Sequence, residues 1–288
     1  MTATSPAFDA EAFKIATRAQ WDKTAGAWND SATVIRPWLS ASTEAMLNMA
    51  GVASGARVLD VAAGAGDQTL DIARQVGPGG FVLATDLSAA ILEFARRNAA
   101  VAGYDNVSTK VSDGESLDVE DSSFDAAVCR LGLMLFPDPL RGLGQIWRAL
   151  KPGARLCTVV FSTPDANPCV RIVLTTALKY AGLPPRDPYQ PGGLLSLGKP
   201  GLIDELFRQA GFREVATTKM AAPFKLPSGH DYLDFIRTAA VPILQILAKL
   251  DSAAQQAAWS EMEAKLEEFR TPSGWEGANE LLLTVGRR

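Results

Sequence analysis

The chain has little of the chemistry that builds disulfide frameworks and zinc sites. Its 288 residues contain three cysteines and one histidine. Cys129, Cys157 and Cys169 are odd in number and show no Cys-x-x-Cys spacing, and His230 is the one histidine that could join them. We therefore expect a reduced, cytoplasmic protein without structural disulfides and without a metal site.

The chain also lacks a dense basic run and a long apolar run. Its 28 basic residues stand against 32 acidic ones, for a net charge of −4, so a nucleic acid is not an expected partner. The longest apolar stretches, such as 241–248, are too short to span a membrane, and the start of the chain does not resemble a signal peptide. The hydrophobic content of 47% suffices for one large domain with an insertion or cap, as a monomer or homodimer.

From residue 56 onward, short β-branched runs alternate with segments of helical period. This alternation is typical of βαβ units and predicts a doubly wound, Rossmann-like α/β fold with a seven-stranded, mostly parallel sheet. A helix over 140–150 is expected to end at Lys151-Pro152-Gly153. The predicted strands are 57–61, 81–85, 107–111, 124–129, 155–161, 214–220 and 280–285.

The pattern divides the chain into four segments. Residues 1–50 are expected to form an N-terminal helical lid, and 51–161 the ligand-binding core. Residues 162–200 are rich in proline and glycine and predict an inserted cap, with one helical stretch near 169–181. Residues 201–288 complete the core and include a helical insertion over 228–270.

The turn after the first strand, in Val-Leu-Asp-Val-Ala-Ala-Gly-Ala-Gly-Asp-Gln-Thr (58–69), carries Gly64 and Gly66 at the entry to a helix. There the backbone can approach a nucleotide-like ligand closely. Gly-x-Gly alone is weak evidence, because tight turns use glycine for structural reasons. A dinucleotide-binding loop usually has a third glycine three positions after the second, and Thr69 stands there.

The charges in this turn favour a cationic ligand over a diphosphate. Asp67 lies at the helix entry, where it would repel a pyrophosphate. Asp60 at the strand end and Asp67 instead suit the α-ammonium and sulfonium groups of S-adenosylmethionine (SAM). Capping of the helix is the alternative role for Asp67.

Two further aspartates follow the next two strands. Asp86 comes 20 positions after Gly66, where a carboxylate can accept from both hydroxyls of a ribose, and Leu87 would pack beside the adenosine. A favourable charge at a helix N-terminus is the alternative role for Asp86. Asp113 could accept from the adenine amino group while the Gly114 backbone approaches the ring, although alone it is an ordinary turn aspartate. All three turns lie at the carboxyl edge of the sheet, where open α/β folds bind ligands.

Together these segments resemble the class I SAM-dependent methyltransferases. The similarity is greatest to the methyltransferase type 11 branch, which includes the ubiquinone and menaquinone biosynthesis C-methyltransferases, and covers roughly residues 20–160. The chain departs from the family pattern at Ala62, where the first loop glycine is usual, and at Ala154. The segments that carry the resemblance are 58–66, Thr-Asp-Leu-Ser (85–88), Ser-Asp-Gly-Glu-Ser-Leu (112–117), 123–138 and 146–154.

The resemblance implies a role for individual residues. Ala62, Gly64 and Gln68 would line the methionine end of SAM, whereas Arg130 and Leu135 would lie under the cofactor and face the acceptor. Residues 21–28, from Trp21 to Trp28, are similar to the family's aromatic lid, where either tryptophan could hold the sulfonium or simply pack. The expected cofactor-binding residues are Asp60, Ala62, Gly64, Gly66, Gln68, Asp86, Leu87, Asp113, Gly114, Arg130 and Trp28.

The expected function is methyl transfer from SAM to a small, lipophilic or aromatic molecule, at oxygen, nitrogen or carbon. An NAD-dependent oxidoreductase and a non-catalytic SAM- or SAH-binding accessory protein are the alternatives; the chain has no Tyr-x-x-x-Lys pair for the former. No catalytic residue is assigned, since methyl transfer needs no obligatory base and His230 suits an exposed capping role. An apolar wall for the acceptor is expected from Leu183, Pro184, Pro185, Tyr189, Leu194 and Leu195.

Overall fold

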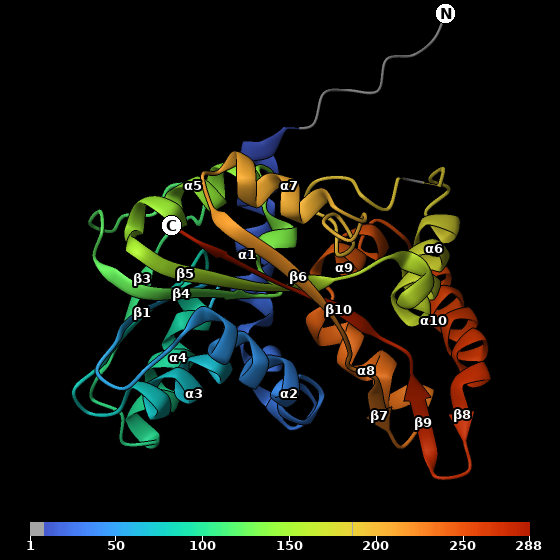
Figure 1. Cartoon of the computed structure of the whole chain (residues 1–288). Coiled ribbons are helices and arrows are strands. Elements are labelled where there is room, and N and C mark those ends of the chain that lie inside the picture. The colour runs from blue at the N-terminus through green and yellow to red at the C-terminus, as the bar shows by residue number, and fades with distance from the viewer. Residues whose placement is uncertain (1–8, 186) are drawn as a thin grey trace, which may run out of the picture.

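A twisted sheet with helices on both faces forms the larger part of the molecule, and a helical layer lies beside one end of it (Figure 1). The computed structural model describes residues 9–185 and 187–288. Residues 1–8 of the predicted N-terminal lid and residue 186 of the predicted cap lie outside the described residues.

The main sheet has seven strands in the order β3-β2-β1-β4-β5-β10-β6. Neighbouring strands are parallel except that β10 runs antiparallel to both β5 and β6. The predicted seven-stranded, doubly wound fold is thus confirmed, and its strand order reverses between β1 and β4, where such folds bind ligands. The strands are β1 (Arg57–Val61), β2 (Phe81–Asp86), β3 (Val107–Val111), β4 (Phe124–Arg130), β5 (Leu150–Phe161), β6 (Arg213–Ala221) and β10 (Glu280–Arg287).

Helices cover both faces of the sheet, as the alternating pattern predicts. One face carries α2 (Ala32–Ala50), α3 (Asp67–Val76) and α4 (Ala89–Val101), and the other carries α5 (Pro139–Ala149) and α7 (Leu202–Gln209) (Figure 1). Each buries the apolar side of its helical period; in α5, Leu143 and Ile146 are fully buried.

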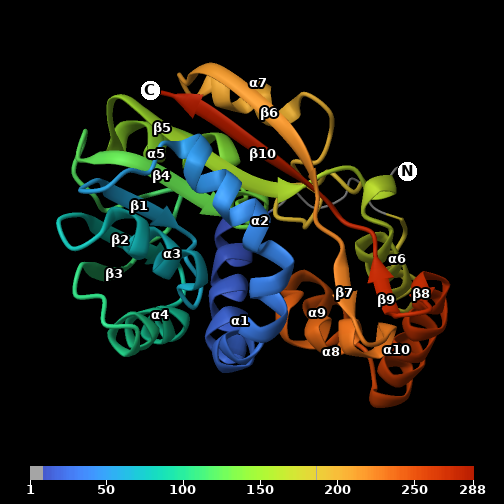
Figure 2. The same ribbon diagram turned by 60° about the horizontal axis from the view of Figure 1, so that its bottom comes forward.

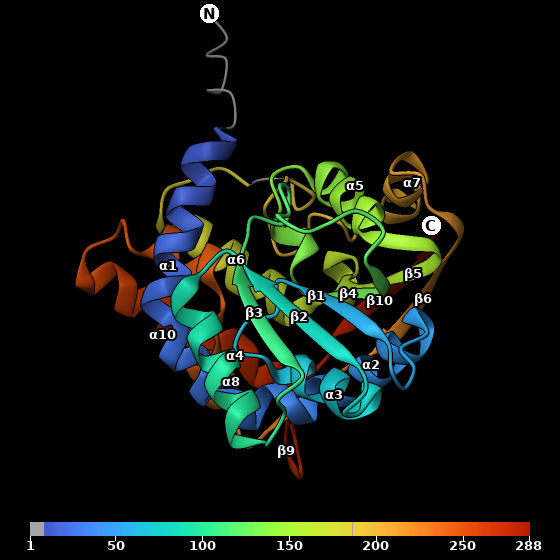
Figure 3. The ribbon, with the colours of Figure 1, turned by 90° about the vertical axis from the view of Figure 1, so that its left-hand side faces the viewer.

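The first helix, α1 (Ala10–Asp30), stands apart from this pattern. Its N-terminus is capped by the Asp9 carboxylate, which accepts from the Ala12 amide at 3.0 Å. It packs between α4 on one side and α8 (Gly229–Ala239) on the other (Figure 2). This position brings α1 to the edge of the sheet at which β1, β2 and β3 end (Figure 3).

The helical layer consists of α6 (Pro168–Tyr180), α8, α9 (Val241–Leu247) and α10 (Ser252–Leu266). It includes a small sheet, β7-β9-β8, that the sequence pattern does not predict. The strands are β7 (Phe224–Leu226), β8 (Arg270–Thr271) and β9 (Gly274–Gly277). They are short, and tertiary packing holds them: Trp275 stacks on Tyr232 at 5.1 Å and donates to the Leu266 carbonyl at 2.7 Å.

The boundary between α5 and β5 differs from the prediction. The helix ends at Ala149 rather than at residue 150, and β5 begins at Leu150, which pairs with Phe124 of β4. A register shift between Phe124 and Ala126 accommodates the added residues. The Lys-Pro-Gly segment that was expected to separate helix from strand lies inside the strand instead.

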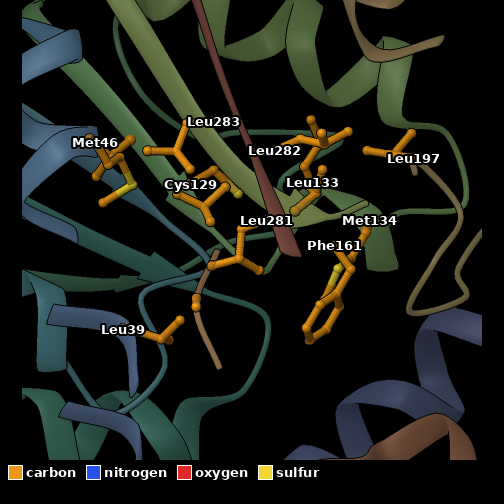
Figure 4. Close-up of a cluster of buried hydrophobic side chains, with 14 of the residues drawn as sticks. Leu39, Met46, Cys129, Leu133, Met134, Phe161, Leu197, Leu281, Leu282 and Leu283 are labelled. Carbon is orange, nitrogen blue, oxygen red and sulfur yellow. The ribbon is translucent and has the colours of Figure 1, made fainter. Parts of the chain in front are cut away.

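The core continues from the main sheet into the helical layer. Leucines of β10 alternate between the two faces of the sheet, as strand geometry requires. Leu283 lies on the side of Met46 of α2, whereas Leu282 lies toward Leu133 and Leu197 (Figure 4). All five of these side chains are buried. Within the described residues, no helix has the length and apolar content that crossing a bilayer requires.

Candidate functional site

The turn between β1 and α3 adopts a left-handed backbone at three positions. Ala62, Gly64 and Gly66 have φ of 56°, 59° and 87°. A Cβ on Gly66 would lie 2.9 Å from the Cα of Ala95 in α4, so this position requires glycine both for its conformation and for helix packing. The methyl group of Ala62 fits because residue 132 has no side chain: a Cβ on Gly132 would lie 2.4 Å from it.

Asp86 at the end of β2 ties this turn to the next. Its carboxylate accepts from the Gly64 amide and from the Ser88 amide, each at 3.0 Å. Burial raises the pKa of Asp86, while these backbone donors act in the opposite direction. Each oxygen retains acceptor capacity, so the carboxylate can still bind hydroxyl donors from the cleft.

Asp113 follows β3 and has a partner that the sequence did not predict. Its Oδ1 accepts from the Glu115 amide at 2.9 Å, and its Oδ2 accepts from Lys14 Nζ of α1 at 2.7 Å. Lys14 also contacts the Glu115 carboxylate at 2.5 Å. Gly114 lies against Phe136, whose ring a Cβ would overlap at 2.2 Å. The turn after β3 is therefore held both by the core and by the N-terminal helix.

One face of α1 closes over these three turns. Phe13, Lys14, Thr17, Trp21 and Trp28 recur on this face and line the same cleft. Trp21 and Trp28 meet edge to face at 5.3 Å and 88°. Trp28 Nε1 comes within 3.3 Å of the position of a Cβ on Gly64, so this ring covers the turn after β1.

The turns and α1 enclose a cleft with an empty volume of about 850 Å³, including its open mouth. Its apolar walls carry a few polar groups, chiefly carboxylates and one guanidinium. Of the expected cofactor-binding residues, those that line it are Ala62, Gly64, Asp86, Leu87, Asp113, Gly114, Arg130 and Trp28. The lining also includes the predicted Trp21 and Leu135. It further includes residues to which no sequence motif assigns a role, namely Phe13, Lys14, Thr17, Leu131 and Phe136.

Three expected residues, Asp60, Gly66 and Gln68, do not line this cleft. Asp60 is fully buried and accepts from Gln68 Nε2 at 3.1 Å and from Thr69 Oγ1 at 2.6 Å. Its partners are therefore internal, and they act against the burial that raises its pKa to about 6. The side-chain amide of Gln68 donates to Asp60 rather than into the cleft. Gly66 allows the turn to pack closely against α4. These three residues support the turn from behind the cleft, and their expected role in cofactor binding stays a prediction.

Asp67 also has internal partners. Arg130 Nη2 lies 2.8 Å from Asp67 Oδ2, and Arg36 Nε lies 2.8 Å from Oδ1. Arg130 is only 7% exposed and donates also to Thr43 Oγ1 at 2.6 Å. Asp67 is the first residue of α3, where Gly66 is the cap, so the alternative of a side-chain cap is wrong. The aspartate instead neutralises a buried guanidinium that reaches the cleft.

The described residues of the predicted cap do not form a wall of the cleft. The apolar residues between Leu183 and Leu195 are not among its lining residues. Instead, a Cβ on Gly192 would lie 2.6 Å from the Phe13 ring, so the segment packs against the outer part of α1.

His230 lies in α8, away from the cleft, and its Nδ1 is 3.0 Å from the Glu263 carboxylate at the surface.

Comparison with known proteins agrees with this geometry. Residues 36–176 match the ubiE/COQ5 methyltransferase family. The chain is 38% identical over 125 residues to the ubiquinone/menaquinone biosynthesis C-methyltransferase UbiE of Hahella chejuensis. These 125 residues are 43% of this chain and 50% of that protein. It thus spans about half the length of the curated relatives it matches. The predicted resemblance to class I SAM-dependent methyltransferases of this branch is confirmed.

Solved structures share the fold at low sequence identity. The YcgJ protein of Bacillus subtilis superposes with a TM-score of 0.59 at 20% identity, over 86% of this chain and 98% of that one. The [4+2]-cyclase SpnF superposes with a TM-score of 0.52 at 22% identity, over 85% and 79% of the two chains. Because one of these is named for a cyclisation, the fold by itself does not define the reaction.

Proposed function

We propose that this chain, which resembles the ubiE-like class I methyltransferases in sequence, transfers a methyl group from SAM to a small, lipophilic or aromatic molecule. The single observation that carries the proposal is the hydrogen bond from the Gly64 amide to the Asp86 carboxylate. In a dinucleotide site the glycine-rich turn presents its amides to a diphosphate. Here an anion at that turn would lie against a carboxylate, which favours a ligand without phosphate.

The residues of the cleft fit the groups of SAM. Asp86 would accept from the ribose hydroxyls and Asp113 from the adenine amino group, with Leu87 and Gly114 against the nucleoside. At the other end, Gly64 would lie beside the amino-acid portion.

The methionine end of the proposed ligand carries a sulfonium and a carboxylate. The face of Trp28 would lie over the sulfonium, a cation–π contact of about 0.5–2 kcal/mol. Arg130 offers its guanidinium to the carboxylate. Because Arg130 is already paired with Asp67, it is held in place before the ligand arrives.

Alignment is the chief contribution that the protein would make to catalysis. When bound, SAM supplies a methyl carbon already activated by its sulfonium. Positioning such a carbon in line with an acceptor can lower the barrier by about 7–11 kcal/mol in favourable cases. Among the described residues that line the cleft there is no histidine, cysteine or tyrosine.

The acceptor would lie over the end of β4. There Leu131, Leu135 and Phe136 form an apolar wall beside Arg130. This surface favours a flat, electron-rich ring, and the ubiE-like match makes the ring carbon of a hydroquinone the first acceptor to test.

Calorimetric titration and product analysis test the proposal. We expect SAM and SAH to bind with micromolar affinity and NADH to show no binding. Incubation with methyl-labelled SAM and a panel of hydroquinones, phenols and amines should yield a labelled product with at least one of them. Binding of NADH in place of SAM would overturn the proposal in favour of an oxidoreductase. SAM binding without any labelled product across the panel would favour a non-catalytic accessory protein.

A further inference from the structure

The hydroxyl of Thr17 is buried in α1 without a partner. Thr17 is 9% exposed, and its Oγ1 has no hydrogen bond. A threonine inside a helix can bond to a carbonyl of the preceding turn, as Thr24 of the same helix does to the Gln20 carbonyl at 3.0 Å. Burying a hydroxyl costs its hydration energy, and here no hydrogen bond within the protein offsets that cost. The stability of the fold therefore does not explain why a hydroxyl is present at position 17.

Two contacts fix where Thr17 lies along the cleft. Three residues before it, Lys14 bonds to Asp113 after β3. Five residues after it, the Asp22 carboxylate accepts from Ser88 Oγ after β2 at 2.5 Å. Since a helix rises about 1.5 Å per residue, Thr17 spans the interval between these two turns. It also lines the cleft itself.

We propose that Thr17 is a ligand-contacting residue whose hydroxyl bonds to the nucleoside portion of the cofactor. The inference rests on the proposed function, because Asp86 and Asp113 on the opposite wall are the groups assigned to the ribose and the adenine. A hydroxyl both donates and accepts, so it can pair with a sugar hydroxyl or a ring nitrogen. Because the Thr17 hydroxyl has already lost its hydration in the free protein, only the ligand's own group must be desolvated when the bond forms.

The test compares Thr17→Val, which removes the hydroxyl at nearly constant shape, with Thr17→Ser, which keeps it. Thr24→Val is the matched control on the same helix, because that hydroxyl is satisfied by the backbone. We expect Thr17→Val to bind SAH roughly three- to tenfold more weakly, which is the usual effect of one hydrogen bond. Thr17→Ser and Thr24→Val should bind SAH as the parent chain does.

The free protein provides a second readout that a structural role would move differently. The thermal midpoint of ligand-free Thr17→Val should equal or exceed that of the parent, since no hydrogen bond is lost. A lower midpoint, by several degrees, would show that the hydroxyl serves the fold and would overturn the proposal. 5′-Methylthioadenosine, which lacks the amino-acid portion, should show the same loss of affinity as SAH. A loss confined to SAH would overturn the assignment to the nucleoside.

The two proposals fail in different ways. If the parent chain does not bind SAH at all, both the proposed function and the role of Thr17 are overturned. If the parent and Thr17→Val bind SAH equally well, only the role of Thr17 is overturned.

Discussion

The ammonium group of Lys14 lies 2.7 Å from the carboxylate of Asp113, although 99 residues separate them in the chain. The same ammonium contacts Glu115, whose side chain is only 4% exposed. One cation thus joins the N-terminal helix to the turn after β3 and helps to hold that helix over the cleft. Burial lowers the pKa of Lys14, but the two carboxylates outweigh it and raise the pKa above its ordinary value.

Replacing Lys14 by methionine should loosen the start of α1. The change leaves the Glu115 carboxylate buried beside an apolar group, at a cost on the order of 1–3 kcal/mol. We expect faster hydrogen exchange across Lys14–Trp21 and a lower free energy of unfolding. Lys23→Met, at an exposed position of the same helix, is the control. Unchanged exchange in Lys14→Met would mean that the other contacts of α1, including the bond between Asp22 and Ser88, suffice to hold the helix.

The stability of the chain should depend on pH through Asp60. Its folded pKa of about 6 exceeds the ordinary 3.8, so the folded state binds this proton more tightly than the unfolded state does. The resulting stabilisation is complete below about pH 4 and is lost as the pH rises through 6, and it amounts to on the order of 3 kcal/mol. Asp60→Asn lacks this titration. Denaturant unfolding should therefore show that the free energy of unfolding of the variant rises relative to that of the parent between pH 4 and 6.5. Parallel pH profiles of the two free energies would contradict this account.

Gly66 and Gly144 should respond to alanine in opposite directions. Gly66→Ala places a methyl group 2.9 Å from Ala95 at a φ of 87°, so we expect a loss of about 2–4 kcal/mol in the free energy of unfolding. Gly144 lies within α5 with open space at its Cβ position, and alanine there should gain about 0.5–1 kcal/mol. Urea unfolding of the two variants provides the comparison. Equal effects would show that the turn after β1 can relax away from α4.

Arg130 and Asp67 should be energetically coupled. Arg130→Met removes a guanidinium that is 5% exposed and leaves Asp67 with Arg36 as its remaining cation, so a loss of about 2–4 kcal/mol is expected. Asp67→Asn should be less harmful in the presence of Arg130→Met than in the parent. A double-mutant cycle by denaturant unfolding measures this coupling. A coupling energy near zero would indicate that Arg130 is held by Thr43 alone.

Local signals in the sequence predict much of the site. A buried strand that ends in Gly-x-Gly, and aspartates at the ends of the next two strands, specify three turns at one edge of the sheet. Gly64, Asp86 and Asp113 accordingly line one cleft. Such features can be read from sequence because parallel strands carry their carboxyl ends to the same edge whatever the rest of the chain does.

Other features depend on contacts between distant segments. Gln68 comes only two residues after Gly66, which made it an expected cofactor-binding residue. Its side chain points inward instead, because it donates to the buried carboxylate of Asp60. The three-stranded β7-β9-β8 sheet forms because Trp275 has Tyr232 to pack on, not because of a periodic pattern.

By itself, then, the sequence determined the succession of the seven main strands along the chain, the sheet edge at which the three turns meet, and the resemblance to the ubiE/COQ5 methyltransferases, because each depends on periodicity and on residues within one turn. Tertiary structure alone decided which polar groups face the cleft, since that choice is made by partners far away in the chain. The ammonium of Lys14 and the unpartnered hydroxyl of Thr17 reach the cleft only because α1 packs across three turns that lie much further along the chain.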